Sequence, residues 1–289
     1  MKKYPAFLLV FFLTQSVLLY SIDWPSASGA ISRNFGWNDQ GLPHLGITFD
    51  TDEEMKAADT GEIFFSRGEG DNASRLPSPL GAWTAVDHGD GIVSVYARSG
   101  GNSRQAETNR VEKGDVLGEA GISGWAERKG IYFQLFDRKE RRWLNPVLII
   151  PPPEDTRAPE ILSVRLRNEQ GQLINPSQTY NLSQGRYTII VNAVDTIRSP
   201  NENPLAPYRI MCSLNGSEVG VLSFETYSAR DGRLMVYRNG LVPVKQIYSP
   251  VPSYEVADVW FSRGQITLEI IAQDITGNAR NAVYRLTVE

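Results

Sequence analysis

Short apolar runs, many of them alternating with polar residues, recur along the whole chain and predict β-strands. Between Ile22 and Ile150 these runs are separated by glycine-rich turns, and none keeps the period of about 3.6 residues that marks an amphipathic helix. Val93, Val95 and Ala97, for example, fall on one face of a predicted strand. The first half of the chain is therefore predicted to be all-β.

Alternation is cleaner in the second half, from Pro159 onward. Leu162, Val164 and Leu166 interleave with polar residues, and the same period of two returns in 266–272 and 284–288. Strands with one buried and one wet face are typical of a β-sandwich. We predict such a sandwich over 159–289.

A proline-rich segment separates the two halves. Pro151, Pro152 and Pro153 are consecutive, and such runs favour an extended polyproline conformation that acts as a semi-rigid spacer. We therefore expect a first domain at 22–150, a linker at 151–158 and a second domain at 159–289, with the linker holding the two bodies apart.

The first 21 residues have the pattern of a secretory signal. Lys2 and Lys3 precede an apolar stretch from Ala6 to Leu19, which is shorter than the roughly 20 residues that span a bilayer. We expect export to the periplasm or surface of a bacterium, and no transmembrane span once the signal at 1–21 is removed. The position three residues before the expected cut at Ser21 is not small, so a retained anchor remains the alternative.

The composition of the chain narrows the classes of function that it can have. The formal net charge is −4, so the basic excess expected of a nucleic-acid-binding protein is absent. The single cysteine, Cys212, excludes an intrachain disulfide, and its apolar neighbours predict a small buried side chain rather than a reactive thiol. An exported form of the chain must therefore be held together by packing.

Three short motifs share an order and spacing with a known family. They read H-L-G-I-T at 44–48, Y-A-R at 96–98 and G-I-Y-F-Q at 130–134. They resemble the H-x-G-x-D, Y-x-H and H-x-H-F-E motifs of lysostaphin-type (LytM) zinc endopeptidases, which cut peptidoglycan cross-links. Matching glycine turns between Phe35 and Pro146 extend the resemblance, which implies a β-sheet domain of the duplicated-hybrid-motif type.

The resemblance also implies which residues should do chemistry. In the family, zinc is held by the first histidine, the aspartate four residues later and the second histidine of H-x-H, and the other histidines serve the reaction. Here His44 keeps the first position, Thr48 replaces the aspartate and Tyr132 the second ligand histidine. Arg98 and Gly130 stand where the two reaction histidines belong.

These replacements predict a degenerate site without catalytic residues or cofactor; zinc belongs to the active relatives. A catalytic zinc needs three protein ligands and one open position. A threonine hydroxyl is neutral, and ionising Tyr132 at pH 7 costs roughly 4 kcal/mol. The guanidinium of Arg98 has no lone pair to accept a proton. His44 is then a vestigial ligand. A relocated site using Asp50 or His88 is the alternative, although His88 fits a turn residue better.

A groove that has lost its chemistry can still bind. Arg98 and Tyr132 offer a fixed positive charge and a flat ring, which together suit a carboxylate. Peptidoglycan stem peptides end in carboxylates, so the resemblance implies binding of peptidoglycan without cleavage. A simply solvated Arg98 is the alternative. The charged run 138–142 is expected to be a solvated hairpin turn rather than a patch for wall phosphates.

Asp274 and Asp195 end predicted strands. The sequence around Asp274 (A-Q-D-I-T-G-N) resembles the strand exit of bacterial immunoglobulin-like modules, and that around Asp195 echoes it. Turn capping explains both aspartates better than calcium binding, because neither lies in a run of alternating oxygen ligands.

Three functions follow from these observations. The first is an inactive peptidase homologue that binds the cell wall or regulates wall hydrolysis, with a wall hydrolase or another envelope protein as a further partner. The second is an active zinc endopeptidase with relocated ligands. The third is a structural or adhesive surface protein in which both domains are building blocks.

Overall fold

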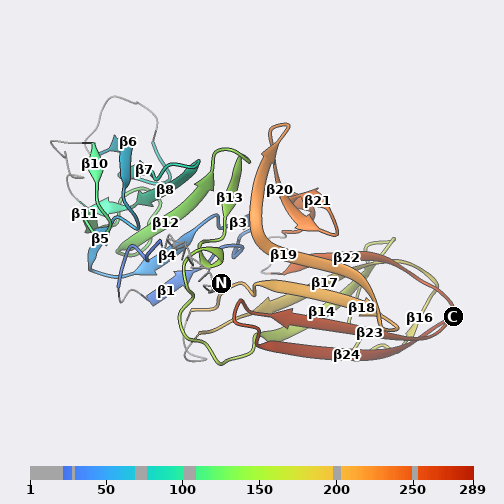
Figure 1. Ribbon diagram of the computed structural model, residues 1–289. Helices are drawn as coiled ribbons and strands as arrows, with labels where there is room; N and C mark the ends of the chain where they lie inside the picture. The colour runs from blue at the N-terminus through green and yellow to red at the C-terminus, as the bar shows by residue number, and fades with distance from the viewer. Residues whose placement is uncertain (1–21, 28–29, 69–76, 101–108, 198–202, 249–252) are drawn as a thin grey trace, which may run out of the picture.

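The computed structural model describes residues 22–27, 30–68, 77–100, 109–197, 203–248 and 253–289 (Figure 1). The predicted signal at 1–21 lies outside them. Strands make up nearly all the regular structure of the described residues, and the other elements are the short 3₁₀ turns η1 (Pro146–Leu148) and η2 (Val244–Gln246). The predicted all-β class is confirmed. Within the described ranges, no helix is long and apolar enough to span a membrane.

The first half is built around β12, which pairs with β8, β4 and β13. Its main sheet runs β10-β6-β7-β8-β12-β13, β1 pairs with β4, and a small sheet runs β5-β11-β9. The strands of this half are β1 (Ala30–Arg33), β2 (Asn38–Asp39), β3 (Leu42–Pro43), β4 (Ile47–Asp50), β5 (Glu54–Lys56), β6 (Gly61–Arg67), β7 (Trp83–Asp87), β8 (Ile92–Ala97), β9 (Ser99–Gly100), β10 (Arg110–Val111), β11 (Val116–Ala120), β12 (Gly130–Asp137) and β13 (Arg142–Leu144).

Alternation along β12 decides what faces the core. Ile131, Phe133 and Leu135 are fully buried in the core of the first half. Because successive side chains of a strand point to opposite faces, Tyr132 and Gln134 lie on the other face of the sheet. That face carries the residues that the family resemblance picks out.

In the second half, two sheets share one core (Figure 1). One runs β15-β14-β17-β22, and the other continues as β19-β18-β23-β24-β16. The strands are β14 (Glu160–Asn168), β15 (Leu173–Ile174), β16 (Asn181–Leu182), β17 (Gly185–Val194), β18 (Arg209–Leu214), β19 (Ser217–Arg230), β20 (Arg233–Arg238), β21 (Leu241–Pro243), β22 (Tyr254–Phe261), β23 (Gly264–Gln273) and β24 (Ala279–Val288).

Most of the alternation predicted for this core is confirmed. Val164 and Leu166 are buried, and so is Cys212. Leu162, expected on the same face, is 54% exposed. The pairing of β14 with β17 slips between Ile161 and Ser163, so the residue at this β-bulge leaves the alternation.

The two halves are joined by strand pairing rather than held apart. β13 pairs antiparallel with β19, with Trp143 opposite Tyr227, so the main sheet runs from one half into the other. Asn34 exchanges two hydrogen bonds of 2.8 Å with the backbone of Ala206. The Tyr248 hydroxyl donates to the Gly36 carbonyl at 2.8 Å.

The expectation of two separated bodies was therefore wrong. Residues 151–158 lie outside the strands, as expected, but Trp24 donates to the carbonyl of Pro151 at 2.9 Å, so the segment packs against the first half. The physical reason is that an open strand edge is satisfied by any strand that can reach it, here β19. Local alternation does not reveal such a partner.

Candidate functional site

His44 follows β3 and is fixed through its backbone. Its N–H donates to the carbonyl of Trp37, and its own carbonyl accepts from the N–H of Gly36, both at 2.9 Å. The imidazole Nε2 lies 3.0 Å from Thr48 Oγ1, and the ring meets Tyr132 edge-on with 5.3 Å between ring centroids. The structure thus brings together three of the positions that the motifs aligned.

The surroundings of His44 keep its imidazole neutral. Burial, followed by the nearby guanidinium groups of Arg98 and Arg33, lowers the pKa of His44 to about 3. Cationic neighbours that disfavour an imidazolium also disfavour a bound dication, because both add positive charge to the same small volume.

Arg98 comes directly after β8 in a strained backbone conformation. Its φ is +69°, a left-handed value that costs a non-glycine residue on the order of 1 kcal/mol. A hydrogen bond from its N–H to the carbonyl of Leu80, 3.0 Å long, holds it there. Its guanidinium carbon lies 5.8 Å from the centre of the Tyr132 ring. With the described residues, this guanidinium forms no ion pair or side-chain hydrogen bond.

Burial and the charge of Arg33 lower the pKa of Arg98 from its ordinary value. A guanidinium remains protonated at neutral pH even so. Holding an unpaired cation in this place therefore lowers the stability of the folded protein, which is a common property of ligand sites.

Tyr132 lies beneath Arg98 and is 6% exposed. Its hydroxyl donates to Gln134 Oε1 at 2.8 Å, and burial raises its pKa above the ordinary value. The phenolate that could hold zinc is thus disfavoured further. In the structure this ring packs against both His44 and Arg98, so it supports these two side chains.

Gly130 begins β12 opposite Asp50 of β4. A Cβ atom at this position would overlap the backbone oxygen of Phe49. The backbone therefore leaves no room for any side chain here, including the histidine of the aligned motif, unless β4 and β12 move apart. This position has therefore lost both the histidine of the motif and the space for one.

A polar pocket of about 150 Å³ opens beside these residues. Thr48 and Arg98 line it, whereas His44, Gly130 and Tyr132 do not. Its other lining residues are Ser32, Arg33, Asp50, Glu127, Arg128 and, from the second half, Asn203. Three arginines against two carboxylates give the lining a net charge of +1.

Ion pairs account for two of those arginines. Arg33 contacts Glu127 at 3.1 Å and Asp39 at 3.2 Å, and Arg128 lies 3.7 Å from Asp50. Arg98 is the arginine of the lining without such a partner among the described residues. The pocket therefore suits an anion, with Arg98 as its binding group.

The residues present do not fit a catalytic zinc. Near His44, the candidate donors are a neutral hydroxyl and a tyrosine whose ionisation is disfavoured, and arginines stand beside them. In the described ranges, the one group of three potential ligand side chains that converge is Asp155, Asp195 and Asp274, and it does not include His44.

Residues 42–146 match the model of peptidase family M23. We call this range the M23 segment. A second family model, which carries no functional description, matches 158–289. No curated protein matches the chain.

Similar solved structures include a SpoIIQ–SpoIIIAH pore-forming complex, with 16% identity, 46% of this chain and 92% of that chain covered, and a TM-score of 0.37. The catalytic domain of lysostaphin from Staphylococcus simulans shows 18% identity over 38% of this chain and 81% of that chain, with a TM-score of 0.32. Lysostaphin from the same organism covers 72% of this chain and 82% of its own at 16% identity, with a TM-score of 0.34.

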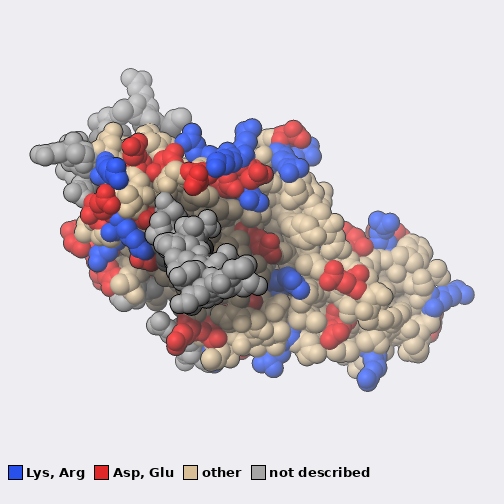
Figure 2. All heavy atoms as spheres, in the orientation of Figure 1, with Lys and Arg blue, Asp and Glu red and all other residues tan. Residues whose placement is uncertain are grey.

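Other polar residues of the M23 segment have structural roles. Both ring nitrogens of His88 are engaged, Nδ1 at 2.9 Å from the Thr60 carbonyl and Nε2 at 2.6 Å from Ser94 Oγ, so the predicted turn role is confirmed. Residues 138–141 form the turn between β12 and β13. Acidic and basic side chains lie mixed along the upper edge of the face in Figure 2, so the described part of this face shows no large patch of one sign.

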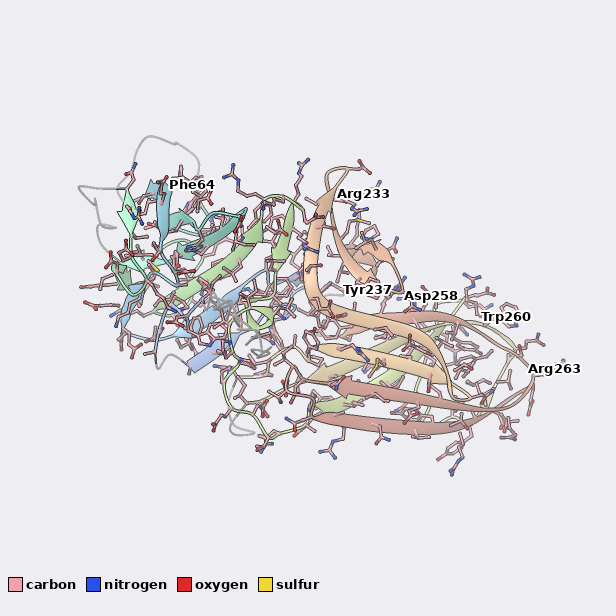
Figure 3. The ribbon with its side chains drawn as sticks, viewed as in Figure 1. Phe64, Arg233, Tyr237, Asp258, Trp260 and Arg263 are labelled. Atoms are coloured by element: carbon pink, nitrogen blue, oxygen red, sulfur yellow. The ribbon has the colours of Figure 1, made fainter. Side chains whose placement is uncertain are left out.

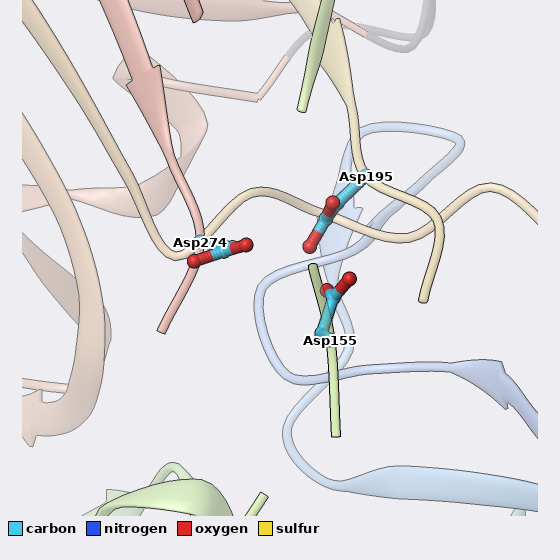
Figure 4. Close-up of side chains that lie close together, drawn as sticks. All are labelled: Asp155, Asp195 and Asp274. Atoms are coloured by element: carbon cyan, nitrogen blue, oxygen red, sulfur yellow. The ribbon is translucent and has the colours of Figure 1, made fainter. Parts of the chain in front are cut away.

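The aspartate cluster (Asp155, Asp195 and Asp274) was not predicted as a unit (Figure 4). Ligand atoms of the three carboxylates lie within 4.8 Å of one another. Asp274 accepts from Thr276 and from the N–H of Asn278, at 3.0 and 2.9 Å, which confirms its predicted capping role. No pattern in the sequence indicates that Asp155 of the linker lies beside these two strand exits.

Proposed function

We propose that the M23 segment binds peptidoglycan or its stem peptides without cleaving them. The proposal depends on Arg98, whose unpaired guanidinium is held beside a pocket. In the active relatives, this position is occupied by a histidine that transfers a proton. Its fixed fork suits a carboxylate, the terminal group of a stem peptide. Tyr132 holds it from beneath, and the ion pairs of Arg33 and Arg128 leave the charge of Arg98 as the net charge of the pocket lining.

We propose that the protein is a pseudo-enzyme. Gly130 leaves no room for the second reaction histidine, and Arg98 cannot accept a proton. Hydrolysis by the family's chemistry would need a bound metal and both reaction histidines, and Arg98 and Gly130 stand in place of those histidines. We further propose that the chain is exported, with residues 1–21 as its signal, and that the second half is an immunoglobulin-like module that fixes the M23 segment in place.

The binding test compares the full chain with two asparagine variants on purified sacculi. Arg98→Asn removes the charge while keeping a residue type that tolerates left-handed φ. Arg263→Asn removes an exposed arginine from the far end of the second half, labelled in Figure 3, as the matched control. Loss of charged hydrogen bonds should weaken binding roughly 10- to 100-fold for Arg98→Asn. The control should bind like the unaltered chain.

Equal binding by both variants would refute the proposed role of Arg98. Catalysis is tested separately, by measuring zinc in the purified protein and the release of muropeptides from sacculi. Stoichiometric zinc together with muropeptide release would establish a hydrolase instead. Binding of an envelope protein but not of sacculi would favour the adhesive or regulatory alternative.

A further inference from the structure

The loop that precedes Glu127 and Arg128 carries two exposed apolar side chains close in sequence to the polar pocket lined by Arg98, which we call the Arg98 pocket. Trp125 is 75% exposed and Ile122 is 61% exposed. Both belong to 121–125, which follows β11 and precedes the pocket residues Glu127 and Arg128. Large apolar side chains left this open on a loop mark interaction sites when they cluster.

Hydrogen bonds tie this loop to the backbone of Arg98 through a neighbouring segment, 79–82. The N–H of Trp125 donates to Pro79, and the N–H of Arg98 donates to Leu80, each at 3.0 Å. Ser123 Oγ accepts from the N–H of Ala82 at 3.0 Å. The same two segments therefore fix both Trp125 and Arg98.

A second tie reaches the residue next to Arg98. Ser123 Oγ also donates to the carbonyl of Ser99 at 2.9 Å, and Ser123 is only 7% exposed. Gly124 follows with φ +70°, packed against the backbone of Gly81, where a side chain would not fit. Trp125 is thus presented by a preorganised backbone, which limits the entropy lost on binding.

The distance from this loop to the pocket is short. Glu127 lines the pocket and is two residues from Trp125, a separation of at most about 7 Å between Cα atoms. A ligand group held at Arg98 and a neighbouring group on Trp125 can therefore belong to one short molecule. Tryptophan and arginine are also the side chains that most often dominate binding energy.

Charge narrows the class of ligand. The net charge of +1 on the pocket lining balances one carboxylate, and the acidic side chains of Asp50 and Glu127 oppose a dianion such as phosphate. An apolar rim beside a site for a single carboxylate matches the end of a peptide.

We propose that Ile122 and Trp125 form a second subsite, which packs on an apolar side chain of a peptide whose free C-terminal carboxylate is bound by Arg98. The inference rests on the proposed function and specifies its ligand as a short peptide with one terminal carboxylate and an apolar residue close to it. Trp125 is then a specificity-determining residue for the groove.

The test uses two acetylated tripeptides, acetyl-Leu-Leu-Ala and acetyl-Gly-Gly-Ala, each as the free acid and as the C-terminal amide. Affinities are measured by calorimetry for the full chain and for three variants. Trp125→Ala removes the apolar platform, Arg98→Asn removes the charge, and Trp260→Ala is the matched control. Trp260 is a tryptophan of β22 that is 53% exposed and lies in the second half (Figure 3).

We expect the leucine peptide acid to bind the full chain at least fivefold more tightly than the glycine peptide acid. Trp125→Ala should abolish this leucine preference and keep the preference for acid over amide. Arg98→Asn should abolish the acid preference and keep that for leucine, and Trp260→Ala should change neither.

A leucine preference that survives in Trp125→Ala, or equal affinity for acid and amide in the full chain, would overturn the inference. Arg98-dependent binding of sacculi would still stand in that case, so the proposed function could hold alone. Conversely, if the peptide preferences are as expected but the chain does not bind sacculi, the subsite would be supported and the proposed role in the cell wall would be refuted.

Discussion

The Arg98 pocket and the aspartate cluster each hold charge that is not fully balanced, but they treat that charge differently. Around Arg98, an arginine is left unpaired in an accessible pocket on a strained backbone. In the aspartate cluster, Asp195 and Asp274 are 7% and 3% exposed, and turn hydrogen bonds satisfy part of each carboxylate. A charge that is open and unpaired indicates a ligand site, whereas charges that are enclosed and capped indicate a structural role.

The stability contributed by the aspartate cluster and by His44, which lies beside Arg98, should depend on pH in opposite directions. Burial, then the charges of Asp155 and Asp274, raises the pKa of Asp195 to about 7, against a lowering by the Thr196 N–H and by Arg157. Burial, then the charges of Arg98 and Arg33, lowers the pKa of His44 to about 3. Three substitutions test this contrast, in order of expected effect.

Asp195→Asn should give the largest change in stability. Because the folded pKa lies above the ordinary value of 3.8, the stability linked to this proton is complete below about pH 4 and is lost as pH rises to about 7. The variant cannot ionise, so at pH 8 its free energy of unfolding should exceed that of the unaltered chain by up to about 4 kcal/mol. Urea unfolding at pH 4, 6 and 8 measures the difference. A gain that is the same at all three pH values would contradict the assignment.

His44→Gln should show the reverse dependence. The folded pKa lies below the ordinary value of 6.5, so stability is complete above that pH and is lost as pH falls toward 3. Because the His44 side chain is only partly buried, the free energy of unfolding of the unaltered chain should fall by roughly 1–2 kcal/mol at pH 4. The variant should not show this loss. The same urea series checks this, and an unchanged acid limb in the variant would refute it.

Arg98→Asn should change stability least. It removes a partly desolvated cation and keeps a residue that tolerates positive φ, so the free energy of unfolding should shift by less than about 1 kcal/mol. Thermal unfolding of the variant beside Arg263→Asn gives the measurement. A loss above about 2 kcal/mol would mean that Arg98 serves the fold, and the contrast between the two clusters would fail.

Much of the fold could be predicted because its signals are local. The buried face of β12 and the inward positions Val164 and Leu166 follow from a period of two, which the sequence displays directly. Leu162 departs from that period because a β-bulge changes the side on which a residue emerges, and the bulge depends on the partner strand.

The site could be predicted in its members but less well in its arrangement. Aligned motifs brought His44, Thr48 and Tyr132 together, and their contacts agree. The left-handed backbone of Arg98 and the burial of Tyr132 depend on neighbours distant in sequence, such as Leu80. Asp155 meets Asp195 and Asp274 for the same reason, since three separate segments must first be folded before their carboxylates approach.

The ladder between β13 and β19 also bears on how this chain can change over evolutionary time. The seam between its halves lies inside a hydrogen-bonded sheet, so neither half ends at a surface that another module could simply replace. Recombination at the proline-rich segment would leave β13 with an open edge and strip Gly36 of its tyrosine partner. The two halves are therefore expected to be inherited together, as one gene segment rather than as interchangeable cassettes.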